Sequence, residues 1–306
     1  KYFDEKLVID TVKPEIKVEY DKNNETGYYN TPRRATVIVK ERNFSPDFVK
    51  WNIKGSNQNY RIGEWRTAEK KGAEDIYYCD IYFDEDGEDY AINLSVSDYA
   101  GNKSEWKDRG YFTIDRTAPE ISIKIGGEDG ISVDEGKQVS EIKYFNKAKE
   151  VQVCIQDKNF DKDQVEYNIR AIEEGKEIKI AKSESYIKEG EKYYNRVILK
   201  KEAKYYIQVK CTDKAGNESE KKEVTFVIDT TAPVITVKGV KDDTTYEEKV
   251  IMPEVVCADK YLDLSSVRVH LMRANGKIVP KKEWNYECFE EQGESGNKKE
   301  TEARVQ

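Results

Sequence analysis

Histidine is nearly absent from the sequence, which contains one histidine among 306 residues. This residue, His270, lies in the alternating run V-R-V-H-L at positions 267–271, and the alternation predicts an outward-facing strand residue. A histidine-dependent nucleophile or metal site needs partner groups at fixed positions around the ring. No phosphate-binding loop, dinucleotide fingerprint or serine-hydrolase motif is present either. We therefore expect that the chain is not an enzyme.

Paired carboxylates keep one catalytic alternative open, because glycosidases use two acidic groups. Such pairs are abundant, for example in D-E-D at 84–86 and E-E at 290–291. They fall in polar, turn-like segments, where a solvated surface is the favoured interpretation.

Long apolar runs and an excess of positive charge are also missing. No segment approaches the roughly 18–20 apolar residues that span a bilayer, and no signal-peptide pattern precedes Lys1. The 60 acidic and 52 basic residues are scattered along the chain and give a net charge of −8. A protein that neutralises phosphates needs a basic stripe, so we expect no nucleic-acid partner and no membrane contact by this segment. We interpret the chain as an excised fragment whose targeting signals lie elsewhere.

The five cysteines are too few and too irregularly spaced for a disulfide framework. Cys154 and Cys211 fall on the second and sixth strands expected in their repeat, where antibody domains place a disulfide. The alternation around Cys154 points its side chain outward, whereas Cys211 shares the inward face of Ile207 and Val209. We therefore expect no bond between them.

What the sequence does contain is a repeat. The segments V-I-D-T-V-K-P-E-I at 8–16, T-I-D-R-T-A-P-E-I at 113–121 and V-I-D-T-T-A-P-V-I at 227–235 match. A second element, D-Y-A-G-N at 98–102, returns as D-K-A-G-N at 213–217. A third runs from Tyr28 to Phe44, returns from Tyr144 to Phe160, and recurs more loosely from Tyr246 to Leu262. Several elements in one order and at one period predict tandem units.

The repeat sets the expected domain boundaries. We expect domains at residues 10–115 and 116–229, and a third at 230–306 that lacks its last two strands. Residues 1–9 are expected to be the last strand of a preceding repeat or an N-terminal extension.

Each repeat is expected to form about seven short strands rich in Val, Ile and Tyr, separated by Gly, Asn, Asp and Pro. In the first repeat we predict strands at 15–20, 34–40, 49–53, 60–65, 76–83, 90–97 and 111–114. About 100 residues with seven strands favour an all-β fold of tandem immunoglobulin-like β-sandwiches in an elongated array.

Three structural roles follow from the motifs. Gly101-Asn102 and Gly216-Asn217 have the turn chemistry that closes a hairpin between the last two strands of a repeat. Pro119 and its counterpart Pro233 are expected to open an edge strand after a link of about four residues, 115–118 in the first case. Tyr90 and Tyr205 resemble the tyrosine corner of immunoglobulin-like sandwiches, with an ordinary amphipathic strand tyrosine as the alternative.

The D-x-T-A-P-x-I opening and the D-x-A-G-N closing resemble the bacterial Ig-like domains of long adhesins and other surface proteins of Gram-positive gut bacteria. The resemblance covers two full repeats and the first half of a third. It implies an extracellular segment at the bacterial cell surface or cell wall, acting as a stalk or adhesion module beside neighbouring Ig-like repeats. Host glycoproteins or glycans are the implied partners, and tyrosine pairs such as Tyr77-Tyr78, Tyr193-Tyr194 and Tyr205-Tyr206 could present one ring outward to them.

The resemblance is compatible with two alternative functions. One is a spacer or accessory module of a secreted carbohydrate-active enzyme, and the other is capture of a host protein such as an immunoglobulin.

The resemblance also bears on cofactors and cross-links. No cofactor is expected, except that some adhesin repeats hold calcium at domain boundaries through aspartates. Here the candidates are Asp98 with Asp115, and Asp213 with Asp229, expected in pairs at one end of each sandwich. An intramolecular Lys–Asn/Asp isopeptide bond is a further family-typical alternative.

Overall fold

A computed structural model describes residues 9–67, 75–127, 130–134, 141–181, 184–247, 251–273, 275–280, 288–295 and 298–305. Within these ranges the chain consists of strands and connecting segments with two short 3₁₀ turns, at Lys162–Gln164 and Leu264–Ser266. The prediction of an all-β protein is confirmed.

The first unit, residues 15–114, contains two five-stranded sheets. One has the order β1-β3-β7-β5, with β6 also paired to β7; the other has the order β2-β10-β8-β4, with β9 also paired to β8. The strands are β1 (Glu15–Tyr20), β2 (Tyr28–Tyr29), β3 (Arg33–Lys40), β4 (Phe44–Lys54), β5 (Tyr60–Ile62), β6 (Arg66–Thr67), β7 (Ile76–Phe83), β8 (Gly87–Asp98), β9 (Lys103–Lys107) and β10 (Phe112–Ile114).

The core of the first unit lies between these sheets because buried and accessible side chains alternate along the strands. In β3 the inward residues Ala35, Val37 and Val39 are completely buried. They share one hydrophobic cluster with Ile92 and Val96 of the opposite sheet. The unit therefore has a sandwich-like core built from two sheets.

The second unit, residues 120–228, repeats this arrangement. Its sheets have the orders β12-β11-β14-β18-β17 and β13-β20-β19-β15-β16. A single cluster from both sheets forms its core, including Ile123, Val153, Ile207 and Phe226. The strands are β11 (Glu120–Ile125), β12 (Ile131–Val133), β13 (Lys143–Phe145), β14 (Lys149–Gln156), β15 (Val165–Glu173), β16 (Lys176–Ile178), β17 (Ile187–Glu189), β18 (Lys192–Leu199), β19 (Ala203–Cys211) and β20 (Lys222–Ile228).

The expectation that Pro119 opens an edge strand applies only to the first half of β11, where 120–122 have no partner strand on the outer side among the described residues. Pro119 does precede β11, but β12 pairs with the second half of β11 and occupies the edge position. The Gly-rich segment after β11 allows the chain to turn back: Gly127 has a φ of 105°, and the Gly130 N–H donates to the Gly127 carbonyl.

The remaining described strands form one four-stranded sheet with the order β21-β22-β24-β23. These strands are β21 (Val234–Lys238), β22 (Glu254–Asp259), β23 (Cys288–Ser295) and β24 (Lys298–Val305). Residues 300–305, near the end of the third expected domain, lie within β24. The prediction for His270 is wrong, because residues 267–271 form no strand and His270 is an exposed residue of a connecting segment.

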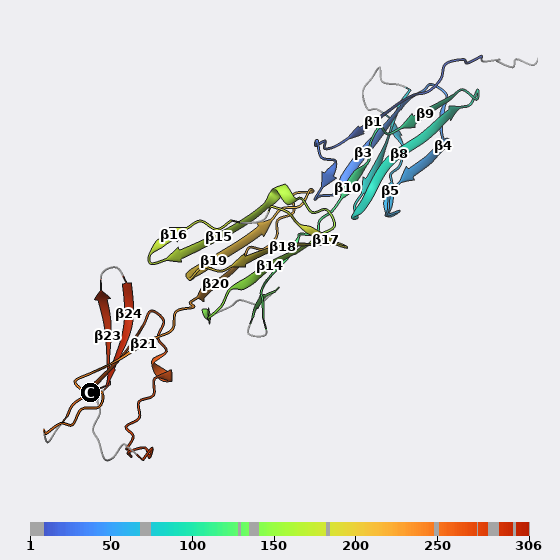
Figure 1. Ribbon diagram of the computed structural model, residues 1–306. Coiled ribbons are helices and arrows are strands. Elements are labelled where there is room, and N and C mark those ends of the chain that lie inside the picture. The colour runs from blue at the N-terminus through green and yellow to red at the C-terminus, as the bar shows by residue number, and fades with distance from the viewer. Residues whose placement is uncertain are drawn as a thin grey trace, which may run out of the picture.

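The two sandwich units and the third sheet follow one another along an extended molecule (Figure 1). None of the described residues form a helix with the length and apolar character that a membrane-spanning helix requires.

Candidate metal centre at the unit joints

Three buried aspartates meet where the first unit joins the second. Asp115 follows β10, Asp157 follows β14 and Asp213 follows β19. One carboxylate oxygen from each lies within 4.8 Å of the others. All three residues are buried, Asp213 to the point where only 3% of its surface is exposed. The joint thus combines an acid of the linker with two acids of the second unit.

Two asparagines hold this cluster together. The side-chain amide of Asn159 donates to Asp115 Oδ2 at 2.6 Å, and that of Asn217 donates to the Asp115 carbonyl oxygen at 2.8 Å. Asn217 also donates through its backbone N–H and its side chain to the two Asp213 oxygens, at 2.8 Å each. The D-x-A-G-N motif therefore anchors the linker to the second unit as well as turning the chain.

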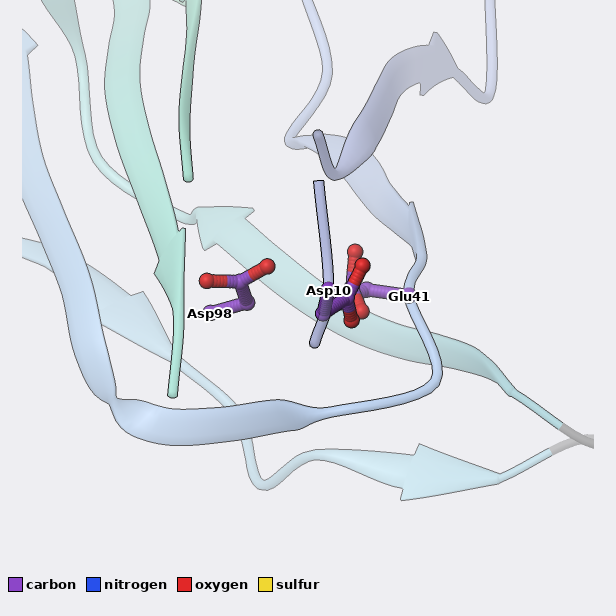
Figure 2. Close-up of side chains that lie close together, drawn as sticks. All are labelled: Asp10, Glu41 and Asp98. Atoms are coloured by element: carbon purple, nitrogen blue, oxygen red, sulfur yellow. The ribbon is translucent and has the colours of Figure 1, made fainter. Parts of the chain in front are cut away.

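The same arrangement occurs at the start of the first unit, where Asp10, Glu41 and Asp98 come together (Figure 2). Asn43 donates to Asp10 Oδ2 at 2.6 Å and Asn102 donates to the Asp10 carbonyl oxygen at 3.0 Å. These bonds match those of the second unit atom for atom. Two three-acid clusters are therefore built in the same way.

The expected pairing of acids within a unit is wrong. Asp98 ends the twelve-residue strand β8, whereas Ile114, just before Asp115, pairs with Gly87 at the start of that strand. At about 3.4 Å per residue, the two acids lie at opposite ends of the sandwich. Asp98 joins Asp10, and Asp213 joins Asp115, so each cluster bridges a linker and the unit that follows it.

Asp229 begins the next linker and has a different setting. Burial and the nearby Asp259 and Glu202 raise the pKa of the Asp229 carboxyl. In place of Asn43 and Asn159 this joint has Tyr261, whose ring contacts Tyr144 at a centroid distance of 5.2 Å. Glu202 accepts hydrogen bonds from Thr230 and Thr231 of the same linker.

The surroundings of two of these acids shift their pKa values in opposite directions. Burial, with the negative charges of Asp213 and Asp115, raises the pKa of Asp157 to about 7, although a backbone hydrogen bond from Asn159 opposes the change. At Asp98 burial also acts to raise the pKa, but hydrogen bonds from Asn102 outweigh it and lower the pKa. A proton or a cation would relieve the repulsion around Asp157.

The donor set fits a hard divalent cation. Calcium takes carboxylate and carbonyl oxygens, and each carboxylate oxygen has lone pairs beyond those used by its hydrogen bonds. Within the described residues, no lysine or arginine forms an ion pair with Asp115, Asp157 or Asp213. These three residues, and Asp10, Glu41 and Asp98 in the first unit, are the ones that could hold the ion.

Other contacts cross the same joint. Lys158 of the second unit pairs with Glu88 of the first at 2.8 Å, and the Lys214 ammonium lies 5.3 Å from the centre of the Tyr28 ring. A cavity of about 350 Å³ lies beside the joint, lined by residues from both units, including Glu88, Asp115 and Lys158. At this joint the two units thus contact each other as well as the linker.

The acids considered for glycosidase chemistry are engaged elsewhere. Asp86 binds the Arg116 side chain at 2.6 Å, and Glu85 lies 3.6 Å from the same guanidinium group. Asp84 lies 3.8 Å from Arg61. Glu290 and Glu291 lie in β23, outside the residues whose side chains are described.

Tyr90 and Tyr205 are fully buried, and each reaches back to the loop before its strand. Tyr205 Oη donates to the Lys201 carbonyl oxygen at 2.8 Å, and Tyr90 Oη donates to that of Glu85 at 3.3 Å. This is the geometry of a tyrosine corner.

The cysteines and the tyrosine pairs follow the strand alternation. Cys211 lies in the core, whereas Cys154 of β14 points away from the core, on the outer face of the other sheet. Both are free thiols. In the pair at 205–206, Tyr205 is in the core while Tyr206 lies on the outer face near Arg170.

Sequence reasoning missed Glu41, Asp157 and the two asparagines that follow them by two positions. A signal was available: E-R-N at 41–43 and D-K-N at 157–159 occupy equivalent places around the repeated Tyr28–Phe44 and Tyr144–Phe160 elements. Neither a scan against protein-family models nor a search of curated proteins finds a match to the chain.

Proposed function

We propose that the chain is a non-catalytic segment of tandem immunoglobulin-like domains from a bacterial surface protein, acting as a stalk or adhesion module outside the cell. The main support for this proposal is the structure of the joints at which each linker meets the unit that follows it. Three acids and two asparagines have the same arrangement at two successive linkers, and at the second the preceding unit also contacts the unit that follows. A protein that projects a binding region needs joints of fixed geometry, and repeated joints give that property to the whole segment.

We also propose that calcium occupies the three-acid clusters. The ion would join a linker carboxylate to two carboxylates of the following unit. It would thereby couple the stability of that unit to the orientation of its neighbour.

Small-angle X-ray scattering on the 306-residue chain tests the stalk. A compact protein of this length has a radius of gyration of about 19 Å, whereas three units placed end to end, each about 40 Å long, require more than about 30 Å. A value near 19 Å would refute the stalk. Antibodies against the two sandwich units should label intact cells; labelling only after permeabilisation would refute the surface location.

A further inference from the structure

The outer face of β4, β8 and β9 in the first unit is basic, in a chain with a net charge of −8. Strand register places Lys50 and Lys54 of β4 on one side of β8, and Lys103 and Lys107 of β9 on the other. These four side chains are exposed. We refer to this surface as the lysine face (its three strands are neighbours in Figure 1).

Among the described residues, Glu105 is the acid that forms ion pairs with lysines of this face. Glu105 contacts Lys103 at 2.8 Å and Lys107 at 3.9 Å. Lys50 and Lys54 form no ion pair with any described residue. The face therefore keeps an excess of positive charge.

Short polar side chains separate the two rows of lysines. The outward residues of β8 are Asn93, Ser95 and Ser97, each half-buried, and Asn52 of β4 lies directly opposite Asn93. Their amide and hydroxyl groups can donate and accept hydrogen bonds. A ligand can approach the backbone of β8 closely while its charges reach the lysines on either side.

The corresponding sheet of the second unit has a different surface. Its central strand β19 presents Tyr206, Gln208 and Lys210, which are long side chains in place of short ones. Lys210 pairs with Glu218 at 2.8 Å, and Gln208 donates to Glu223 at 2.8 Å. Scaffold features recur in both units, whereas the lysine face belongs to the first alone.

We propose that the lysine face binds an anionic polysaccharide, a glycan chain that carries carboxylate or sulfate groups. The lysines supply charge, and the amides and hydroxyls suit a ligand rich in hydroxyl groups. Nucleic acid fits less well, because single strands bind by stacking bases on aromatic rings, and the residues between the lysine rows are not aromatic. The exposed rings of Phe48 and Tyr99 lie beyond Lys50 and pack edge-to-face on each other, with a centroid distance of 5.2 Å. The inference rests on the proposed adhesion role, to which it adds a class of ligand.

Calorimetric titration of the 306-residue chain with chondroitin sulfate, hyaluronan and neutral dextran tests the proposal. We expect binding to at least one of the two anionic glycans, none to dextran, and weaker binding as salt screens the charges. The double variant Lys50→Glu, Lys107→Glu should bind about tenfold more weakly, since each reversal replaces an attraction with a repulsion. Its thermal unfolding should match that of the wild type.

Two further variants separate the lysine face from general electrostatics. Arg170→Glu, at the position in the second unit equivalent to Lys54, should leave binding unchanged. Ser95→Lys adds a positive charge but puts a long side chain between the lysine rows, as in the second unit, and should weaken binding.

The proposal is overturned by absence of binding to both anionic glycans, by wild-type affinity in the double variant, or by equal loss in Arg170→Glu. Tighter binding by Ser95→Lys would overturn the role of the short side chains. An oligonucleotide that binds as tightly as the glycans would overturn the ligand class. Scattering reports separately on the stalk, so the two proposals can fail independently.

Discussion

At the joint before the second unit, Asp157 is the acid whose pKa is raised by its surroundings. Its pKa is raised to about 7 in the folded chain, against an ordinary value of 3.8. Between these values the folded state binds a proton that the unfolded state has released. The stabilising contribution is therefore complete below about pH 4, declines as pH rises towards 7, and is absent above it.

This linkage predicts that, in chelator, the second unit melts at a lower temperature at pH 8 than at pH 5. The variant Asp157→Asn should remove most of this difference by raising the melting temperature at pH 8. Calorimetric melting curves at the two pH values provide the measurement. Asp163→Asn, which changes an exposed acid of the same unit, is the matched control; an equal effect of both substitutions would contradict the assignment to Asp157.

Tyr205 offers a second prediction at this scale. Tyr205→Phe removes the hydrogen bond to the Lys201 carbonyl but keeps the buried ring, so the unfolding free energy should fall by about 1 kcal/mol. Tyr206→Phe, on the outer face of the same strand, should change it little. Urea denaturation would give the unfolding free energy of each variant. Equal unfolding free energies for Tyr205→Phe and Tyr206→Phe would show that the hydroxyl group of Tyr205 contributes nothing measurable.

At the scale of the element, the D-x-A-G-N hairpin between β8 and β9 depends on its glycine. Gly101 has a φ of 88°, and no atom would obstruct an added Cβ there. Gly110 also has open space around it but does not have a positive φ. Gly101→Ala should therefore cost about 1 kcal/mol through backbone strain alone, while Gly110→Ala is neutral or slightly stabilising. Chemical denaturation would show the difference, and equal costs would exclude the backbone explanation.

Strand prediction succeeded where a segment alternates and pairs over its whole length. The predicted limits of β1 and β7 agree with the structure residue for residue. Sequence reasoning missed β2 and β9, and it predicted one strand at 60–65 where the structure has β5 and, at 66–67, β6. The two residues of β2 pair in parallel with β10, far away in sequence, and such a short segment shows no period. In β9 the alternation is visible in K-S-E-W-K, but the turn chemistry of the preceding motif predicts that the chain passes directly to the last strand.

The acids of the candidate site were found from the repeat, but their partners were not. Asp98, Asp115 and Asp213 stand out because their motifs recur, yet a motif does not show which end of a strand it occupies. Asp98 and Asp115 belong to one repeat and lie at opposite ends of it. The spatial neighbours of Asp115 come from the following repeat, a relation that requires the sheet register and the direction of each strand.

For the whole molecule, the clusters predict that calcium stabilises the chain. A ligand that binds only the folded state adds about 2.7 kcal/mol at a concentration one hundred times its dissociation constant. Millimolar calcium should therefore raise the melting temperature at pH 8. The increase should be smaller at pH 5, where the proton on Asp157 competes with the ion.

The double variant Asp98→Asn, Asp213→Asn removes one carboxylate from each cluster and keeps the size of each side chain. It should lose most of the calcium response, whereas Asp163→Asn should keep it. Scattering in calcium and in chelator would then show whether the ion also fixes the joint, because a joint that loosens in chelator broadens the distribution of end-to-end distances. Identical melting and scattering curves in calcium and chelator would mean that hydrogen bonds from Asn159 and Asn217, with protonation of Asp157, are sufficient to hold the linker.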